Sequence, residues 1–340
     1  MQGGMCASSR HFLMTWRGRI GEDEHVQSPA PSTTTQRLPT RVEWPTVAVA
    51  LTIWSLWAVL VFAHRSIPWP VSIVGLAIAG GWYMSLQHEV IHGHPTPWRA
   101  VNLSLAVWPI HFWLPYQVFR DEHLEHHEIE LTVPGVDPES FYVSPAGWAD
   151  AGWLRRMFLR VNRTYLGRVL VGPLVGVPSH VVGQIRKALG DRAHARIWLG
   201  HLVLVAAIAW VVFGVVGMPV WEYLVGFVWL GMSLTYTRSF VEHRAVADPA
   251  NRTAFVQSGT LFGLLFLFNN LHHAHHTRPG MAWYRLPALS AELGSAEIAR
   301  QGAGYYRTYR EVIRRYAFRP FDVPVHPVMA DAAAAGPSER

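Results

Sequence analysis

Long apolar runs separated by short polar turns dominate the chain. One pair of runs covers residues 44–63 and 69–86, and a second pair covers residues 197–216 and 220–240. A helix that crosses a bilayer needs ~20 apolar residues, and each run is close to that length. The links inside each pair are only long enough for a tight turn. The pattern therefore predicts an all-α integral membrane protein with four transmembrane helices in two hairpins.

Two further apolar stretches, 101–119 and 169–182, are interrupted by prolines. Proline removes a backbone hydrogen bond and kinks or breaks a helix. We therefore interpret both stretches as interfacial or re-entrant segments rather than straight crossings.

The two ends of the chain differ from this apolar middle. Residues 1–42 end in a stretch rich in Pro, Ser and Thr without apolar periodicity, which predicts a disordered tail. Residues 323–340 contain an alanine run followed by Gly-Pro-Ser, which predicts a flexible tail. Residues 43–322 are left as one membrane domain.

Composition agrees with a membrane protein. Only 15% of the residues are charged, and the chain has 16 tryptophans, a residue that gathers at membrane interfaces. The net charge is +6, but the basic residues are scattered among apolar runs, which argues against nucleic-acid binding. Cys6 is the only cysteine, so an internal disulfide and a CxxC zinc site are excluded.

The distribution of basic residues predicts the orientation. The two hairpin turns contain only Arg65, whereas arginines are frequent in residues 120–196 and 285–315. By the positive-inside rule, both termini and the segment between the hairpins are cytoplasmic, which fits a multi-pass protein of the cytoplasmic membrane.

Three histidine clusters lie next to the predicted helices. They are His88 and His92; His123, His126 and His127; and His272, His275 and His276. Residues at i, i+3 and i+4 project from one face of a helix, so each cluster can present its imidazoles together. All three clusters fall on the predicted cytoplasmic side.

Eight clustered imidazoles indicate more than one metal. Neutral imidazole binds zinc, iron, copper and nickel, but a zinc site usually uses only three or four protein ligands. Eight ligands, or nine with His243, suit a pair of metals that stay open to an outside ligand. Two irons in such a site can activate O2, and their place near the membrane suggests a lipid-like C–H bond as the target.

A rival interpretation rests on His88-Glu89-Val90-Ile91-His92, which is the H-E-x-x-H signature of zinc proteases. An intramembrane protease would use Glu89 as general base, but it would leave the other two clusters without a role. In the iron interpretation, Glu89 orients an imidazole or lies on the far face of its helix.

The order H-x-x-x-H, H-x-x-H-H and H-x-x-H-H resembles the membrane fatty acid desaturase and hydroxylase superfamily, over residues 44–290. The resemblance implies a four-helix membrane domain with a cytoplasmic di-iron cap, a tunnel for a long acyl chain and an outside electron donor. It also implies a further histidine after the fourth helix, which His243 matches. Acyl-CoA desaturases of the family have an Asn one turn earlier, where this chain has Ser239, so Glu242 or Asn269 is expected to compensate.

The expected metal ligands are therefore nine histidines: His88, His92, His123, His126, His127, His243, His272, His275 and His276. We expect His94 and His273 to lie outside the ligand set, and His111, His180 and His201 to be packing residues. Four carboxylates are candidates to hold ligating imidazoles: Asp121, Glu122, Glu125 and Asp137. For Asp137, an exposed loop position is an equal alternative.

The sequence thus predicts an O2-dependent di-iron oxidoreductase that acts on a long-chain lipid, with desaturation of an acyl chain preferred. Hydroxylation of a fatty acyl, ornithine-lipid-like or carotenoid-like substrate is the alternative. No cytochrome b5, ferredoxin or flavin motif is recognisable, so we expect a separate electron donor. The basic cytoplasmic face fits an acidic ferredoxin-like protein or lipid headgroups equally well.

Overall fold

The computed structural model describes residues 38–335, and these residues form a mostly helical protein. Residues 1–37, most of the predicted N-terminal tail, lie outside the described part. Within it, the regular strands are β1 (Phe255–Val256) and β2 (Tyr305–Tyr306), which pair in parallel. The all-α expectation therefore holds apart from this short two-stranded sheet.

Within residues 38–335, three helices are long and apolar enough to cross a membrane. They are α1 (Trp44–Phe62), α2 (Trp69–Ile91) and the continuous helix Arg192–Val215, which comprises α8 (Arg192–Ala209) and η3 (Trp210–Val215). The last of these exposes Leu199, Leu202 and Val203, as a helix surrounded by lipid would.

The fourth expected crossing, residues 220–240, is helical but is not among the candidate spans. It consists of α9 (Val220–Tyr223), the π-helix η4 (Leu224–Leu230) and α10 (Gly231–Ser239). Glu222 and Arg238 near its two ends, with several hydroxyl side chains between, reduce its hydropathy. Four crossings in two hairpins therefore stay a prediction.

Helix α2 is the element that the others surround. It packs against α1 on one side and against η4 and α10 on the other, with η1 (His64–Ser66) in the turn after α1. The crossing with α10 depends on glycine, because a Cβ added to Gly231 would lie 3.0 Å from the Gly80 Cα. Small residues of this kind let two membrane helices approach closely.

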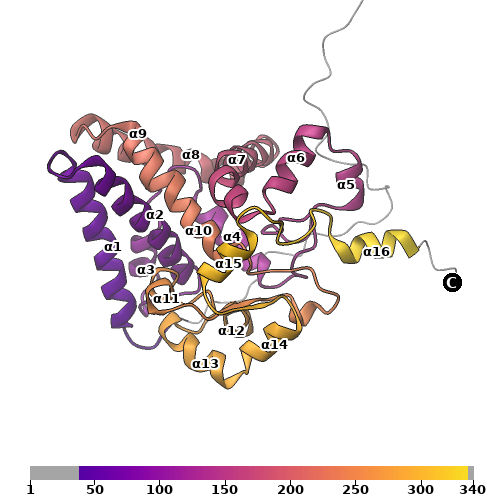
Figure 1. Cartoon of the computed structure of the whole chain (residues 1–340). Helices are drawn as coiled ribbons and strands as arrows, with labels where there is room; N and C mark the ends of the chain where they lie inside the picture. The colour runs from indigo at the N-terminus through magenta and orange to yellow at the C-terminus, as the bar shows by residue number, and fades with distance from the viewer. Residues whose placement is uncertain (1–37, 336–340) are drawn as a thin grey trace, which may run out of the picture.

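The remaining elements are mostly shorter helices around this core. Figure 1 shows α11 to α14 gathered at one end, below α1 and α2. Elements before α8 are α3 (Arg99–Ala106), α4 (Tyr116–His126), α5 (Pro145–Ala149), α6 (Trp153–Val161), η2 (Gly167–Val171) and α7 (Gly172–Gly190). Elements after α10 are η5 (Pro249–Asn251), α11 (Thr260–Leu265), α12 (His272–Thr277), η6 (Trp283–Arg285), α13 (Leu286–Glu292), α14 (Ser295–Gln301), α15 (Tyr309–Tyr316) and α16 (Pro327–Ala335).

The proline-interrupted stretches are shorter or bent helices. Residues 101–119 divide between α3 and α4, with an irregular segment between them, and α7 carries Pro178 inside it. Helix α7 exposes Leu174 and Leu189, which agrees with an interfacial position without demonstrating one.

The described part of the segment after residue 322 makes specific contacts. Val325 forms a parallel bridge with Val143, and His326 is buried next to the hydroxyl group of Thr132. The predicted flexible tail therefore starts with residues that contact the domain, and the domain boundaries stay predictions.

We predict that Gly231→Leu destabilises the helical core. The added side chain meets the backbone of α2 at Gly80, and overpacking of this kind costs typically about 1–3 kcal/mol, or more where backbone cannot move. Thermal unfolding of the detergent-solubilised protein measures the effect. Gly183→Leu in α7 is the control, because a Cβ there meets no atom within 4 Å, and equal melting temperatures for the two variants would contradict the prediction.

Candidate metal centre

Four separate segments bring the nine expected histidines into one region. The end of α2 carries His88 and His92, and α4 with the residue after it carries His123, His126 and His127. His243 follows α10, and α12 carries His272, His275 and His276. Helix α2 ends at Ile91, and Gly93 then adopts a positive φ of 98°, a common way to stop a helix.

The imidazoles divide into a group of five and a group of four. The five-histidine group consists of His88, His92, His123, His127 and His275, and the four-histidine group consists of His126, His243, His272 and His276. Within each group, the candidate ligand atoms all lie within 4.8 Å of one another. Each group can therefore surround one metal ion.

Pairs of histidines four residues apart stay in the same group. His88 with His92, and His123 with His127, belong to the five-histidine group, while His272 with His276 belongs to the other. Adjacent residues of an α-helix point about 100° apart. This explains why His126 and His127, or His275 and His276, reach different groups.

The Nε2 atoms face one another at short distances. In the five-histidine group, the Nε2 of His275 lies 3.1 Å from that of His88 and 3.0 Å from that of His127. In the four-histidine group, the Nε2 of His243 lies 2.9 Å from that of His272 and 3.1 Å from that of His126.

The other ring nitrogens donate to fixed acceptors. His123 Nδ1 donates to Glu139 at 2.8 Å, and His126 Nδ1 donates to Asp137 at 2.8 Å. The Nδ1 atoms of His272 and His243 face the backbone carbonyls of Asn269 at 3.2 Å and Arg252 at 3.4 Å. A neutral imidazole carries one proton, so the Nε2 atoms of these rings hold lone pairs.

Lone pairs that face one another require a cation between them. His243 and His272 direct such lone pairs toward one another, and His126 adds a third once its Nε2 proton is displaced. Metal-ligating histidines typically donate their second N–H to a carboxylate or a backbone carbonyl, as these do. The residues present therefore fit a bound metal ion in each group.

The nitrogen spacing favours a metal with ligands at right angles. Imidazole nitrogens lie about 2.1 Å from such a metal, so two ligands at right angles stand about 3.0 Å apart, and two at the tetrahedral angle about 3.4 Å apart. The observed Nε2 spacings of 2.9–3.1 Å match the first geometry. Structural zinc is almost always tetrahedral, and the observed spacings are shorter than that geometry gives.

Burial keeps most of these rings neutral. Burial, followed by neighbouring imidazoles, lowers the pKa of His92, His127, His275 and His276, and burial lowers the pKa of His243 to about 3. For His126, burial lowers the pKa, but the carboxylates of Glu139 and Asp137 outweigh burial and raise it to about 9. A metal that binds His126 therefore displaces a proton.

Arg238, Glu242 and Asn269 lie behind the four-histidine group. Arg238 donates to Glu242 at 2.9 Å, and a Glu242 oxygen lies 3.5 Å from His272 Nδ1. The Asn269 side chain lies 3.3 Å from His88 Nε2 and 3.2 Å from His272 Nδ1, between the two groups. Both residues expected to compensate for Ser239 thus contact candidate ligands.

The prediction of carboxylates that hold the imidazoles is partly confirmed. Asp137 contacts His126, and it is buried rather than part of an exposed loop. Asp121 pairs with Arg120, and Glu122 accepts from Gln184, while Glu139 contacts His123 and was missed. The sequence places Glu139 16 residues after His123, a separation without a helical or strand period that could have signalled the contact.

The H-E-x-x-H segment does not form a separate zinc site. Both of its histidines belong to the five-histidine group, and Glu89 accepts a hydrogen bond from the backbone N–H of Trp283. The Glu89 carboxylate thus ties α2 to η6, and its nearest oxygen lies 3.7 Å from His88 Nδ1, away from the ligating atom.

The remaining histidines lie outside both groups. His94 is buried and bonded to Glu43 at 2.7 Å. His273 contacts the hydroxyl group of Ser295, His111 contacts Gln87 and His201 contacts the carbonyl of Phe112. His180 packs edge-on against Trp113. These contacts agree with structural roles.

Comparison with known families gives one result that covers most of the chain. The family model described as "Fatty acid desaturase" matches residues 63–309. That range contains all nine histidines and their partners Asp137, Glu139, Glu242 and Asn269. A comparison with curated protein sequences finds no match.

We predict that the purified protein contains two iron ions per chain. His276→Ala removes one of only four candidate ligands of the four-histidine group and is expected to reduce the content to about one. His273→Ala is the matched control, because its ring faces Ser295, and it is expected to keep both metals. Elemental analysis by mass spectrometry measures the content, and a single zinc per chain would instead support the protease interpretation.

Proposed function

The chain belongs to the fatty acid desaturase family, and on that premise we propose that it is an O2-dependent di-iron oxidoreductase acting on a long-chain lipid. The preferred reaction is desaturation of a fatty acyl chain. The observation that carries the proposal is the arrangement of nine imidazoles as two adjacent groups of five and four.

When bound, two irons in these groups would supply the activation of O2 and the removal of hydrogen from a methylene group. The nine histidines would hold the metals through Nε2. Glu139 and Asp137 hold the Nδ1 protons of His123 and His126, which fixes both rings. Six of the nine histidines are buried, so the protein keeps bulk water away from the reacting atoms.

An apolar groove that is open to the surface of the molecule supports a lipid substrate. It has a volume of about 410 Å³ and is lined by side chains of α1, α3, α8 and the segment after α3, including Trp54, Trp57, Leu105 and Ile110. This volume lies within the range of small-molecule sites. Tyr83 of α2 donates hydrogen bonds to the carbonyls of Ala106 and Trp108 beside this groove, one helical turn and a residue before His88.

Desaturation and hydroxylation share the first hydrogen removal. Loss of a second hydrogen gives a double bond, whereas transfer of oxygen gives an alcohol. The outcome depends on how closely the second C–H bond approaches the site, which the bound substrate determines. Hydroxylation of a fatty acyl, ornithine-lipid-like or carotenoid-like substrate is therefore the alternative.

The proposed orientation follows from charge. Arginines gather in the segment between the two helix pairs and in the C-terminal third of the chain, so by the positive-inside rule the histidine site faces the cytoplasm of a multi-pass protein. A separate cytoplasmic electron donor is then able to reach the side of the molecule that carries the histidine site.

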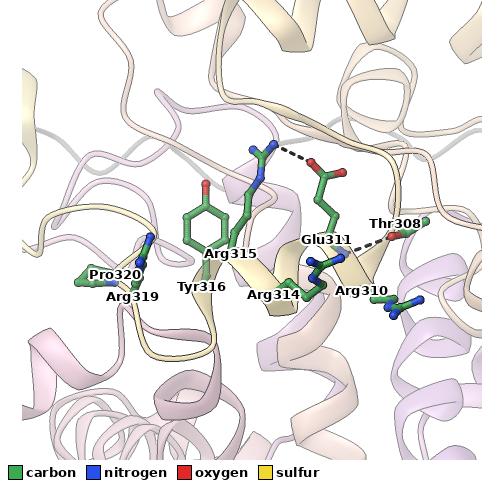
Figure 2. A pocket seen from close by; sticks show the side chains of 8 residues that line it. All are labelled: Thr308, Arg310, Glu311, Arg314, Arg315, Tyr316, Arg319 and Pro320. Carbon is green, nitrogen blue, oxygen red and sulfur yellow. Dashed lines mark hydrogen bonds and ion pairs between the residues drawn. The ribbon is translucent and has the colours of Figure 1, made fainter.

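Helix α15 is the proposed docking surface for that donor. Figure 2 shows Arg310, Arg314, Arg315 and Arg319 around one open groove with a volume of about 700 Å³. Only Arg315 among these four is drawn with an ion-pair partner, Glu311 at 2.7 Å. An acidic redox protein complements this charge, and such complementarity raises association rates.

The buried face of α15 leads toward the histidines. Tyr309 is fully buried, in a cluster that also contains Phe240 and Val241, the two residues before Glu242. Glu242 in turn faces His272. A donor on α15 is thus separated from a candidate ligand by few residues, which favours a redox protein over lipid headgroups as the occupant.

We predict that lipids of a host expressing the protein lose two hydrogens per modified chain, in an O2-dependent manner. His275→Ala is expected to abolish the change while the protein still inserts into membranes, because it removes a ligand of the five-histidine group. His273→Ala is expected to retain it. Mass spectrometry of extracted lipids distinguishes this result from a gain of one oxygen, which would establish the hydroxylase alternative.

We predict that Arg314→Glu weakens turnover supported by an acidic ferredoxin. Reversal of one exposed charge in the groove is expected to raise the KM for the donor several-fold. The salt dependence of this KM is expected to decrease. Turnover driven by a small chemical reductant is expected to stay unchanged. Arg300→Glu on α14, outside the groove, is the control; if both variants behave alike, or if only binding to anionic vesicles falls, the docking proposal fails.

A further inference from the structure

The segment before α16 is held against the loop formed by residues 131–143. Val325 forms a parallel bridge with Val143, and the backbone N–H of His326 donates to the carbonyl of Val143 at 3.0 Å. The His326 ring packs edge-on against Tyr142 and is buried. A histidine that the sequence assigns to a flexible tail therefore lies in the interior of the domain.

The hydrogen bonds of His326 define its tautomer. Burial lowers the pKa of His326, which favours the neutral ring. Its Nδ1 accepts from the backbone N–H of Met329 at 3.3 Å, so the single ring proton is on Nε2. This Nε2 lies 3.2 Å from the hydroxyl oxygen of Thr132, which is also buried. His326 therefore donates a buried hydrogen bond to Thr132.

Thr132 has a strained backbone. Its φ is 74°, in the left-handed region that β-branched residues rarely adopt. Such a conformation persists only where the surrounding structure holds it, and strain of this kind gathers at functional sites. The Ser140 hydroxyl donates to the Thr132 carbonyl, and Arg252 donates to the carbonyl of Leu131. The hydrogen bond from His326 is the contact that holds the Thr132 side chain.

The strained turn directs a backbone N–H at the carboxylate that holds a candidate ligand. The Thr132 N–H donates to Asp137 Oδ2 at 2.7 Å, and the Glu139 N–H donates to Asp137 Oδ1 at 2.8 Å. The same Oδ1 accepts from His126 Nδ1 at 2.8 Å. A series of buried contacts thus runs from His326 through Thr132 and Asp137 to a ring of the four-histidine group.

We propose that His326 is a positioning residue for metal binding by the four-histidine group, acting through Thr132 and Asp137. The inference rests on the proposed function only in that it requires a metal ion in this group, whatever its identity. Without the Nε2–H donor, Thr132 leaves the left-handed conformation, its N–H turns away from Asp137, and the His126 ring gains rotational freedom. A ligand that must be ordered on binding holds its metal more weakly.

The five-histidine group is expected to depend less on this series. It contacts the loop through Glu139 and His123, and it keeps four other candidate ligands. Loss of the His326 hydrogen bond is therefore expected to weaken one metal site and spare the other.

Chelator titration of the purified full-length protein in detergent tests the proposal, with metal per chain measured by mass spectrometry. His326→Phe keeps a ring against Tyr142 but removes the donor. It is expected to release one metal at an about tenfold lower chelator concentration, the lower end for lost outer contacts of a ligand, and the other metal as in the wild type. His326→Gln supplies an amide N–H in place of Nε2–H and is expected to restore most of the affinity. His180→Phe, at a ring that packs on Trp113 outside both groups, is the control and is expected to match the wild type.

Two further variants keep the test decisive if His326→Phe does not fold. Thr132→Val removes the other partner of the same hydrogen bond at nearly constant shape, so it is expected to weaken the same site. Combined with His326→Phe, it is expected to add little, as for two residues that share one interaction. In a His276→Ala background, where the four-histidine group is already emptied, Thr132→Val is expected to leave the remaining metal unchanged.

The outcomes separate this proposal from the proposed function. A wild-type protein with two metals, which His326→Phe and Thr132→Val release as the wild type does, overturns the positioning role and leaves the proposed function standing. Equal weakening of both sites, or a loss that His326→Gln does not restore, also overturns it, because a general loss of stability gives that result. A wild-type protein that binds no metal overturns both.

Discussion

The repulsion among inward-facing imidazole lone pairs is the constraint on which the site depends. Carboxylates and backbone carbonyls hold the Nδ1 protons of His123, His126, His243 and His272, so their Nε2 atoms face inward. At separations of about 3 Å, these nitrogens are stable together only around a cation. The same burial that keeps the rings neutral makes the arrangement unfavourable without metal, so metal binding and folding of the histidine-bearing segments are expected to be linked.

Packing within the helical core fixes where the histidine-bearing segments lie. Helix α2 contributes His88 and His92 at one end and packs through Gly80 and Gly81 against α10, which leads into His243. The close crossing therefore fixes the relative position of His92 and His243, which are 151 residues apart. Helix α12 lies on the opposite side, where Ala274 turns inward against Leu286 and Leu289 while the histidines face the metal groups.

Charge is distributed unevenly around the candidate metal centre. Arg238, Arg163 and Arg168 lie on the same side as Glu139 and Glu242, so the carboxylates that support the ligands are shared between imidazole and guanidinium groups. Two metal ions in the histidine groups would add positive charge, which these carboxylates would offset. The arginines of α15 extend the same positive field to the surface, where an acidic donor is the proposed partner.

The sequence by itself determined the candidate residues: the apolar runs predict the long helices, and helical spacing identifies eight of the nine histidines because helical periodicity is a local property. His243 has no histidine at helical spacing and was expected from the family resemblance. It also supported the family assignment. Only the tertiary structure decided how the nine divide, since His126 and His127 are neighbours in the chain yet point to different groups. Glu139, the Glu43 partner of His94 and the buried pair Arg163 and Arg168 likewise depend on contacts between distant segments, for which the chain carries no periodic signal.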